Sequence, residues 1–320
     1  MSDPRDLDTA EFEVPILSNA TKFEPPISSR VRLEFGSATH KGLVRSKNED
    51  SYLIYRVGRY WEKLTTTLNP DELPGRIEET GYTLAVADGM GGMAGGEVAS
   101  STALRLIANL VLRAARWAKK LDNPETRDSE IKEAMVRAET YFRTVDDWLV
   151  QYAEIYPALK GMGTTLTSAY VFGKDLFTLH VGDSRAYLLR KDDLSLLTRD
   201  QTVAQQLADR GVIKQDEVES HFLRHTLTSC LGGRGGEIDL EVRHYQLLDN
   251  DRLLLCTDGL TDMVPHTRIS ETLQLTLDAQ QACDTLVATA LEEGGRDNVT
   301  ALVANYHCPE NSSNPEPSNP

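Results

Sequence analysis

Two short apolar runs of the sequence each end in an Asp-Gly pair. Residues 82–87 lead into Asp88-Gly89, and residues 253–257 lead into Asp258-Gly259. Taken alone, such a pair is typical of a turn. A carboxylate that directly follows a buried apolar strand, however, needs a strong partner. Two such strand ends in one chain therefore favour a chemical role for both aspartates.

The first pair opens a run that is rich in glycine. Five of the nine residues from Asp88 to Gly96 are glycine, so the backbone there can come close to a ligand or to another segment. A merely flexible loop would have the same composition. A phosphate-binding P-loop is excluded, because the Lys-Ser/Thr ending which that motif requires is absent.

Further acids stand at the ends of other predicted strands. Asp297 comes directly before residues 298–306, and Glu49 and Asp50 come directly before another apolar run. Acids at several strand ends can meet at one rim of a β core. An oxygen-only cluster, without histidine or cysteine, suits a hard cation such as Mg²⁺ or Mn²⁺. Periodicity and spacing do not by themselves show that these acids converge.

Six short motifs, taken in order, resemble those of one enzyme family. They are RSKNED at 45–50, VADGMGG at 86–92, GMGTT at 161–165, VGDSR at 181–185, TDGL at 257–260 and GRDN at 295–298. The set resembles the metal-dependent serine/threonine protein phosphatases of the 2C type, in their bacterial form. The match covers roughly residues 35–306, and six motifs in order are far more specific than one.

The resemblance implies an α+β fold, a four-layer α-β-β-α sandwich of two antiparallel sheets flanked by helices. It implies hydrolysis of phosphoserine and phosphothreonine on proteins, in opposition to kinases in signalling. It also implies two Mn²⁺ or Mg²⁺ ions per chain in a cleft at one edge of the sheets. Carried over by motif, Asp88 would bridge both metals and the Gly89 carbonyl would bind one. Asp258 and Asp297 would hold the other metal. Glu49 would support the metal that the Gly89 carbonyl binds.

Two more residues receive roles from the resemblance. Asp50 would hydrogen-bond metal-bound water, and Arg45 would hold the substrate phosphate. The guanidinium is a planar fork that matches phosphate oxygens.

The sequence departs from the family pattern at two positions. Lys160 stands where many members have an aspartate for a third metal, and a protonated lysine cannot bind Mg²⁺. Its ammonium could replace part of the missing charge near Asp258, or it could point to solvent. Met90 stands where animal enzymes have a histidine that can act as general acid, so the proton donor is not identified. Lys160 is also the one residue that favours an alternative, a catalytically weak module that binds phosphoproteins.

The overall charge limits the classes of partner that the protein is expected to bind. The 320 residues carry 34 Lys and Arg against 49 Asp and Glu, a formal net charge of −15. A negative net charge disfavours nucleic acid and anionic membranes as partners. It also argues against the hypothesis that the protein is a nuclease or a phosphodiesterase. No signal peptide and no membrane-spanning run is visible. We therefore expect a cytoplasmic monomer that acts on phosphorylated proteins.

One large domain, residues 30–306, must position these groups, between an acidic flexible arm (1–29) and a disordered tail (307–320). Short apolar runs bounded by turn residues predict strands at 82–87, 164–172, 176–181, 185–190, 253–257 and 298–306. Helical spacing predicts helices at 97–119, from 129 onward, at 202–210 and at 279–292. Residues 56–80 are predicted to be an extra-long hairpin loop. Residues 198–234 match the variable flap of the family, with a possible glycine hinge at 232–236.

Overall fold

The computed structural model describes residues 26–69, 73–91, 95–113, 121, 123–233 and 238–309. Most of the expected arm and tail, together with residues 114–119 of the helix predicted at 97–119, lie outside these segments. The packed part begins a little before residue 30, since residues 27–29 form a short 3-10 helix in which Ser28 is buried. At the other end, the Cys308 side chain is also buried.

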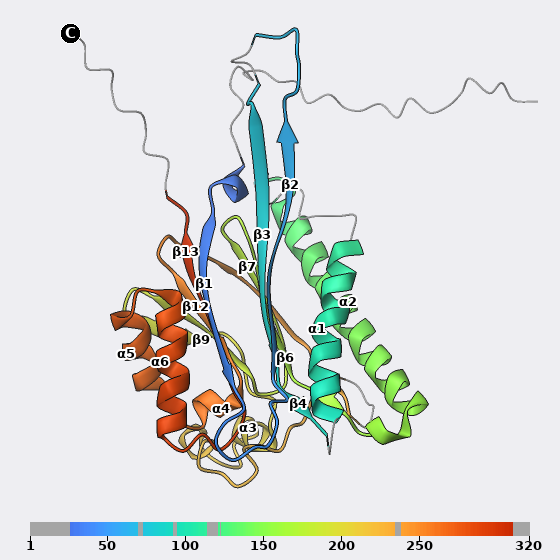
Figure 1. The fold of residues 1–320 in the computed structure, drawn as a ribbon, viewed down its shortest axis with the longest axis vertical. Coiled ribbons are helices and arrows are strands. Elements are labelled where there is room, and N and C mark those ends of the chain that lie inside the picture. Colours follow the sequence, from blue (N-terminus) through green and yellow to red (C-terminus); the bar gives the residue numbers. More distant parts are fainter. Residues whose placement is uncertain are drawn as a thin grey trace, which may run out of the picture.

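Two five-stranded antiparallel sheets form the centre of the molecule (Figure 1). The first has the order β1-β13-β12-β8-β9, with β1 at Arg32–His40, β13 at Val299–His307, β12 at Arg252–Cys256, β8 at Arg185–Arg190 and β9 at Asp193–Leu196. The second has the order β11-β7-β6-β3-β2, with β11 at Glu241–Gln246, β7 at Asp175–Val181, β6 at Leu166–Phe172, β3 at Arg76–Ala87 and β2 at Ser51–Glu62. A small sheet, β10-β5-β4, joins Leu231–Gly232, Gly163–Thr164 and Gly89–Met90.

The two large sheets pack face to face through apolar side chains. Leu84 and Val171 of one sheet and Leu253 and Leu302 of the other belong to one buried cluster. Each of these four side chains is fully buried, and burial of this kind stabilises by about 1.5–3 kcal/mol per side chain.

Helices cover both outer faces, which confirms the predicted four layers. α1 (Gly95–Arg113) and α2 (Arg127–Ile155) lie on the sheet that contains β3, and α5 (His266–Leu275) and α6 (Ala279–Glu292) lie on the sheet that contains β13 (Figure 1). The short helices α3 (Val203–Asp209) and α4 (Asp258–Thr261) lie at the same end of the sandwich as β4. None of the helices described is long and apolar enough to cross a membrane.

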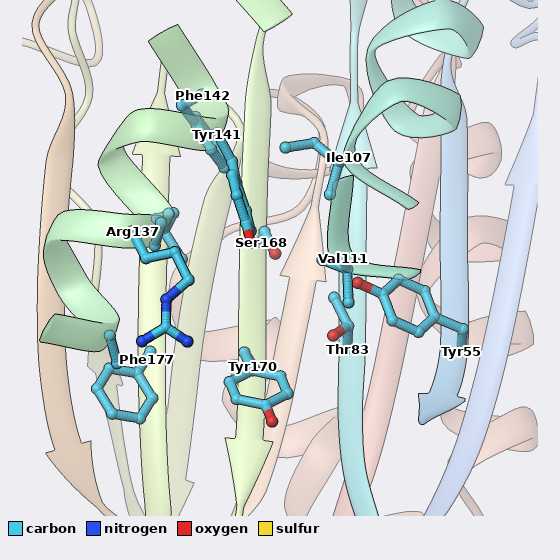
Figure 2. Close-up of a pocket in the computed structure, with 13 residues that line it drawn as sticks. Tyr55, Thr83, Ile107, Val111, Arg137, Tyr141, Phe142, Ser168, Tyr170 and Phe177 are labelled. Carbon is cyan, nitrogen blue, oxygen red and sulfur yellow. The ribbon is translucent and has the colours of Figure 1, made fainter. Parts of the chain in front are cut away.

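A small cavity remains between α1, α2 and the sheet. Its volume is about 130 Å³. In Figure 2, Ile107 and Val111 reach it from α1, Tyr141 and Phe142 from α2, and Tyr170 from the sheet. This space belongs to the packing of helices on sheet.

The prediction for residues 56–80 is wrong. These residues largely continue a regular hairpin, because β2 runs to Glu62, β3 starts at Arg76, and the two pair along their whole length. The outer half of β2 is exposed, so its sequence lacks the alternation that marks a half-buried strand. Figure 1 shows the tip of this hairpin projecting away from the end that carries α4.

Other boundaries differ from the predictions in smaller ways. The strand predicted at 164–172 is interrupted at Thr165, between β5 and β6. Helix α5 and the strands β1, β9 and β11 were not predicted. Helix α3 confirms the helix predicted at 202–210: Thr202 caps its start, and Gly211, just after its end, has a φ of +70°.

Candidate active site

Hydrogen bonds of its backbone N–H and carbonyl fix Asp88 at the end of β3. Its carboxylate is therefore not needed to hold the residue in place. The Asp88 N–H donates to Thr165 Oγ1 at 2.9 Å, and the Thr165 N–H donates to the Asp88 carbonyl at 2.9 Å. Thr164 Oγ1 donates to the same carbonyl at 2.8 Å. The interruption of the strand at Thr165 is thus what anchors Asp88.

The glycines after Asp88 allow three segments to meet. A β-carbon placed on Gly96 would lie 2.7 Å from the Gly89 carbonyl oxygen and 2.8 Å from Oε2 of Glu49. Gly89 is equally crowded, since its own β-carbon would lie 2.7 Å from the Glu49 carbonyl oxygen. The start of α1 therefore packs directly against two of the predicted metal ligands, which requires glycine at both positions.

Asn298 holds the segment that carries Arg45 and Glu49. Its Oδ1 accepts a hydrogen bond from the Glu49 N–H at 2.7 Å. Its Nδ2 donates to the carbonyls of Lys41 and Lys47 at 2.9 and 2.8 Å. Asn298 belongs to the motif GRDN at 295–298, but the sequence predicted no role for it. The amide next to Asp297 is the signal that could have suggested one.

Asp50 is buried and only half satisfied. Its Oδ2 accepts hydrogen bonds from Thr257 at 2.8 Å and from Thr300 at 2.7 Å. Its Oδ1 is buried and has no hydrogen-bond partner among the described residues. Burial, partly offset by the two threonines, raises the pKa of Asp50 to about 7. The two threonines were not predicted.

The structure brings the predicted acids together at one end of the sandwich. The pKa of Asp88 is raised well above its usual value by burial and by the nearby carboxylates of Asp50, Asp258, Asp183 and Asp297, in decreasing order. Asp183, on the turn after β7, belongs to the motif VGDSR at 181–185 but was not predicted as a site residue. Burial and the Asp258 carboxylate raise its pKa too.

Arg45 stands at the exposed rim of this cluster. Its Nη2 lies 2.6 Å from Oδ2 of Asp297, and its side chain is 56% exposed. The hydrogen bond and the charge of Asp297 raise the pKa of Arg45, with smaller contributions from Asp88 and Glu49. The guanidinium is therefore within electrostatic reach of the acids and still accessible to a ligand.

Lys160 does not take part in an ion pair with any described residue. It follows the short 3-10 helix at Pro157–Leu159, its side chain is exposed, and its backbone N–H donates to the Pro157 carbonyl. The side chain that lies near Asp258 is instead that of His225, whose Nδ1 is 3.7 Å from Asp258 Oδ2. No histidine was predicted here, since nothing in the sequence links His225 to Asp258.

The chemistry of this donor set fits a divalent cation. Five carboxylates raise one another's electrostatic energy, and the orphaned oxygens Asp50 Oδ1 and Asp258 Oδ1 are buried without a hydrogen-bond partner in the described segments. Buried unpaired carboxylates are costly unless a cation compensates them. Fold and site together define a sandwich protein with a carboxylate cluster at the rim of its sheets, of a kind that suits a divalent cation.

Comparisons with known proteins agree with this class. The family model described as "Protein phosphatase 2C" matches residues 65–294. Serine/threonine protein phosphatase PstP of Mycobacterium tuberculosis is 35% identical over 272 residues, 85% of this chain and 45% of the relative. Serine/threonine phosphatase stp of Listeria welshimeri is 33% identical over 83% of this chain and 92% of the relative. The chain thus spans a little under half the length of PstP.

Solved structures show the same architecture. The crystal structure of the Mycobacterium tuberculosis phosphatase PstP/Ppp matches with a TM-score of 0.66 and 34% identity, covering 85% of this chain and 98% of that one. The catalytic domain of PstP in complex with two manganese ions matches with a TM-score of 0.65 and 32% identity, covering 87% and 99%. This chain belongs to the protein phosphatase 2C family.

Proposed function

We propose that this chain is a metal-dependent phosphatase that hydrolyses phosphoserine and phosphothreonine on proteins. The observation that carries the proposal is the convergence of Asp50, Asp88, Asp258 and Asp297 around buried carboxylate oxygens that lack partners. The printed functions of PstP and stp, serine/threonine phosphatases, support the same reaction.

Two divalent cations, Mn²⁺ or Mg²⁺, are proposed for this centre. Asp88, the Gly89 carbonyl and Glu49 would hold one, and Asp88, Asp258 and Asp297 the other. When bound, such a pair offsets the charge of a phosphate ester and lowers the pKa of a water molecule. The manganese complex of the PstP catalytic domain is a precedent in a relative for two ions.

The protein's own groups bind and orient the reactants. Arg45, once its fork turns from Asp297 toward the substrate, can donate two parallel hydrogen bonds to phosphate oxygens. Asp50, with Oδ2 fixed by two threonines, keeps Oδ1 available to accept a hydrogen bond from the attacking water. Charge stabilisation of this kind, built into a rigid frame, supplies a large part of catalysis.

The alternative, a phosphoprotein-binding module without turnover, is not favoured. It rests on Lys160 alone, whereas all the other predicted site residues stand at one rim of the sheets. A cytoplasmic location and a monomeric state stay predictions.

Turnover on three substrate classes tests the proposal. The protein would be assayed with Mn²⁺ or with a chelator on a phosphothreonine peptide, on a phosphodiester and on single-stranded DNA. We expect release of phosphate from the peptide only, and only with metal. Cleavage of the diester or DNA would indicate the rival enzyme class, and peptide binding without release of phosphate would indicate the binding module.

A further inference from the structure

A groove lies along the outer half of the β2–β3 hairpin, which projects away from the end that carries α4 (Figure 1). Its volume is about 490 Å³. Both strands, the connection between them and the start of the folded part line it, through Tyr60, Trp61, Ile77, Leu73, Pro74 and Pro26. The groove is therefore separate from the acidic centre.

Two large aromatic side chains of this groove are exposed to solvent. Tyr60 is 67% exposed and Trp61 is 44% exposed. Aromatic side chains that lie side by side with prolines on a surface mark a place where another segment binds. Grooves of this kind bind extended segments that contain proline, because such segments lose little conformational entropy on binding.

The chain enters the folded part at the edge of the groove. Pro26 has an extended backbone, with φ −61° and ψ 152°. Its carbonyl accepts hydrogen bonds from the Ser29 N–H at 3.0 Å and from Ser29 Oγ at 2.7 Å. Ser28 Oγ donates to Oε1 of Glu79 on β3 at 3.4 Å. Residues 1–25 are therefore attached to a residue that itself lines the groove.

The sequence of residues 1–25 contains one dense apolar run. Residues 12–17 read Phe-Glu-Val-Pro-Ile-Leu, between stretches that are mostly polar or charged. Pro15 lacks an N–H, so this run is suited to bind through its side chains rather than as a regular strand. Ile16 precedes Pro26 by ten residues, and an extended chain spans about 3.3–3.6 Å per residue. The run can therefore reach the whole groove.

The charges of the two parts are complementary. Residues 1–25 contain six acidic residues and two basic ones. Arg59 lines the groove, and Arg76 lies over the ring of Tyr60, at 5.4 Å from its centre. Each arginine is near a glutamate of β3, yet each side chain is more than half exposed. Both guanidinium groups can therefore donate to a further carboxylate, such as that of Glu13.

We propose that residues 12–17 bind in the hairpin groove of their own chain. Their apolar side chains pack against Tyr60 and Trp61, and Glu13 lies beside the two arginines. The N-terminal segment then covers an aromatic surface that would otherwise be open to association with other chains. The inference does not depend on the proposed function, because the groove and the acidic centre lie at different ends of the molecule (Figure 1).

Two rival occupants have to be distinguished. Residues 309–320 contain four prolines, but they have no other apolar side chain. The second rival is the N-terminal segment of another copy of the chain. Both would fill the groove, and both make different predictions about which glutamates are protected from a protease.

The test is limited proteolysis of the full chain, with Mn²⁺ present, by a protease that cleaves after glutamate. Mass spectrometry follows cleavage after Glu11 and Glu13. Each rate is compared with that of a free peptide of residues 5–22 that has the same sequence. We expect cleavage in the protein to be at least about fivefold slower, because the rate follows the fraction of molecules in which the segment is released.

Substitutions on both sides of the contact should abolish this protection. Tyr60→Ala and Trp61→Ala change the groove, and Ile16→Ser changes the segment without altering the folded part, which keeps the test valid if a groove variant misfolds. Leu64→Ala is the matched control, because Leu64 is 87% exposed in the same hairpin but does not line the groove. It should keep the protection of the wild type.

Each other outcome overturns the proposal. Equal rates in the wild type and the free peptide would show that the segment does not bind. Protection that survives Tyr60→Ala and Trp61→Ala would show that it binds elsewhere, and protection that is lost on dilution would assign the groove to a second copy. Protection at Glu316 but not at Glu13 would assign it to residues 309–320. Phosphate release should be the same in all variants, so these outcomes leave the proposed function intact.

Discussion

At the scale of single residues, the acids of the site carry a cost that a cation removes. Burial and neighbouring carboxylates raise the pKa values of Asp50, Asp88 and Asp183 in the metal-free protein. The folded state therefore holds protons that the unfolded state has lost above pH of about 4. By linkage, stability then falls as pH rises, and for Asp50 this window runs from about 4 to about 7.

This sign gives a prediction for metal and pH together. In chelator the melting temperature should fall between pH 5 and pH 7.5, and Mn²⁺ should raise it more at pH 7.5 than at pH 5. Asp50→Asn, which removes one raised pKa, should show a smaller fall in chelator. Differential scanning fluorimetry measures all three. A Mn²⁺ stabilisation that is equal at both pH values would contradict the assignment.

Arg45 gives a second prediction at this scale. A hydrogen bond to a charged group contributes about 1.5–3 kcal/mol, so Arg45→Ala should lower kcat/KM for a phosphothreonine peptide by about 10- to 150-fold. Arg45→Lys should recover only part of this loss, because an ammonium lacks the planar fork. Mn²⁺ affinity should stay within a few-fold of the wild type. An unchanged kcat/KM in Arg45→Ala would show that Arg45 does not bind the substrate phosphate.

Gly96 tests the close approach of α1 to the site. Gly96→Ala would place a methyl group 2.8 Å from the Glu49 carboxylate and 2.7 Å from the Gly89 carbonyl, so we expect at least a tenfold loss of Mn²⁺ affinity. Gly75→Ala is the control, since nothing lies within 4 Å of its β-carbon. Isothermal titration with Mn²⁺ compares the two. Equal affinities would show that this contact is not important for the centre.

Sequence patterns predicted the identity of most of these groups but not their supports. Asp88 and Asp258 were identified from the strand ends, and Arg45 from the resemblance. The residues that hold them, such as Thr257, Thr300 and Asn298, are ordinary polar side chains until the fold brings them from distant positions to Asp50 and Glu49. His225 and Asp183 were missed for the same reason.

At the scale of elements, the prediction succeeded where local signals agree. Helix α6 begins and ends as predicted, and Asp278 caps it by accepting a hydrogen bond from the Gln281 N–H at 2.7 Å. Helix α5 was missed because it is short, begins after Pro265, and has few apolar positions to show a helical period. The outer half of the β2–β3 hairpin was predicted as loop, because its exposed residues do not show the alternation of a half-buried strand.

The packing of α2 on the sheet is open to a stability test. Phe142 is 2% exposed and lies in the cluster that joins α1, α2 and the sheet. Phe142→Ala should lower the free energy of unfolding by about 3–5 kcal/mol. Leu275→Ala, at an 82% exposed position of α5, should change it by less than about 0.5 kcal/mol. Urea unfolding measures both, and a small loss for Phe142→Ala would contradict this role of Phe142 in the packing of α2.

At the scale of the whole molecule, convergence of the acids is the feature that no local pattern could predict. Thr257 and Thr300 both lie far from Asp50 in the sequence. Only the strand order of the two sheets brings the three residues to one rim. The family resemblance supplied this step, and the structure gives it a physical basis. The net charge of −15 is compatible with a phosphate substrate, because bound cations and Arg45 would offset the negative charge locally.

The central claim is that the carboxylate centre around Asp88 carries out Mn²⁺-dependent hydrolysis of phosphothreonine. The most direct measurement is kcat/KM on a phosphothreonine peptide with saturating Mn²⁺ for the wild type, for Asp88→Asn and for Asp193→Asn, an exposed acid on β9. We predict a loss of about 100- to 1,000-fold for Asp88→Asn, as for the removal of a group that stabilises developing charge, and no change for Asp193→Asn. Equal rates in the wild type and Asp88→Asn would contradict the account.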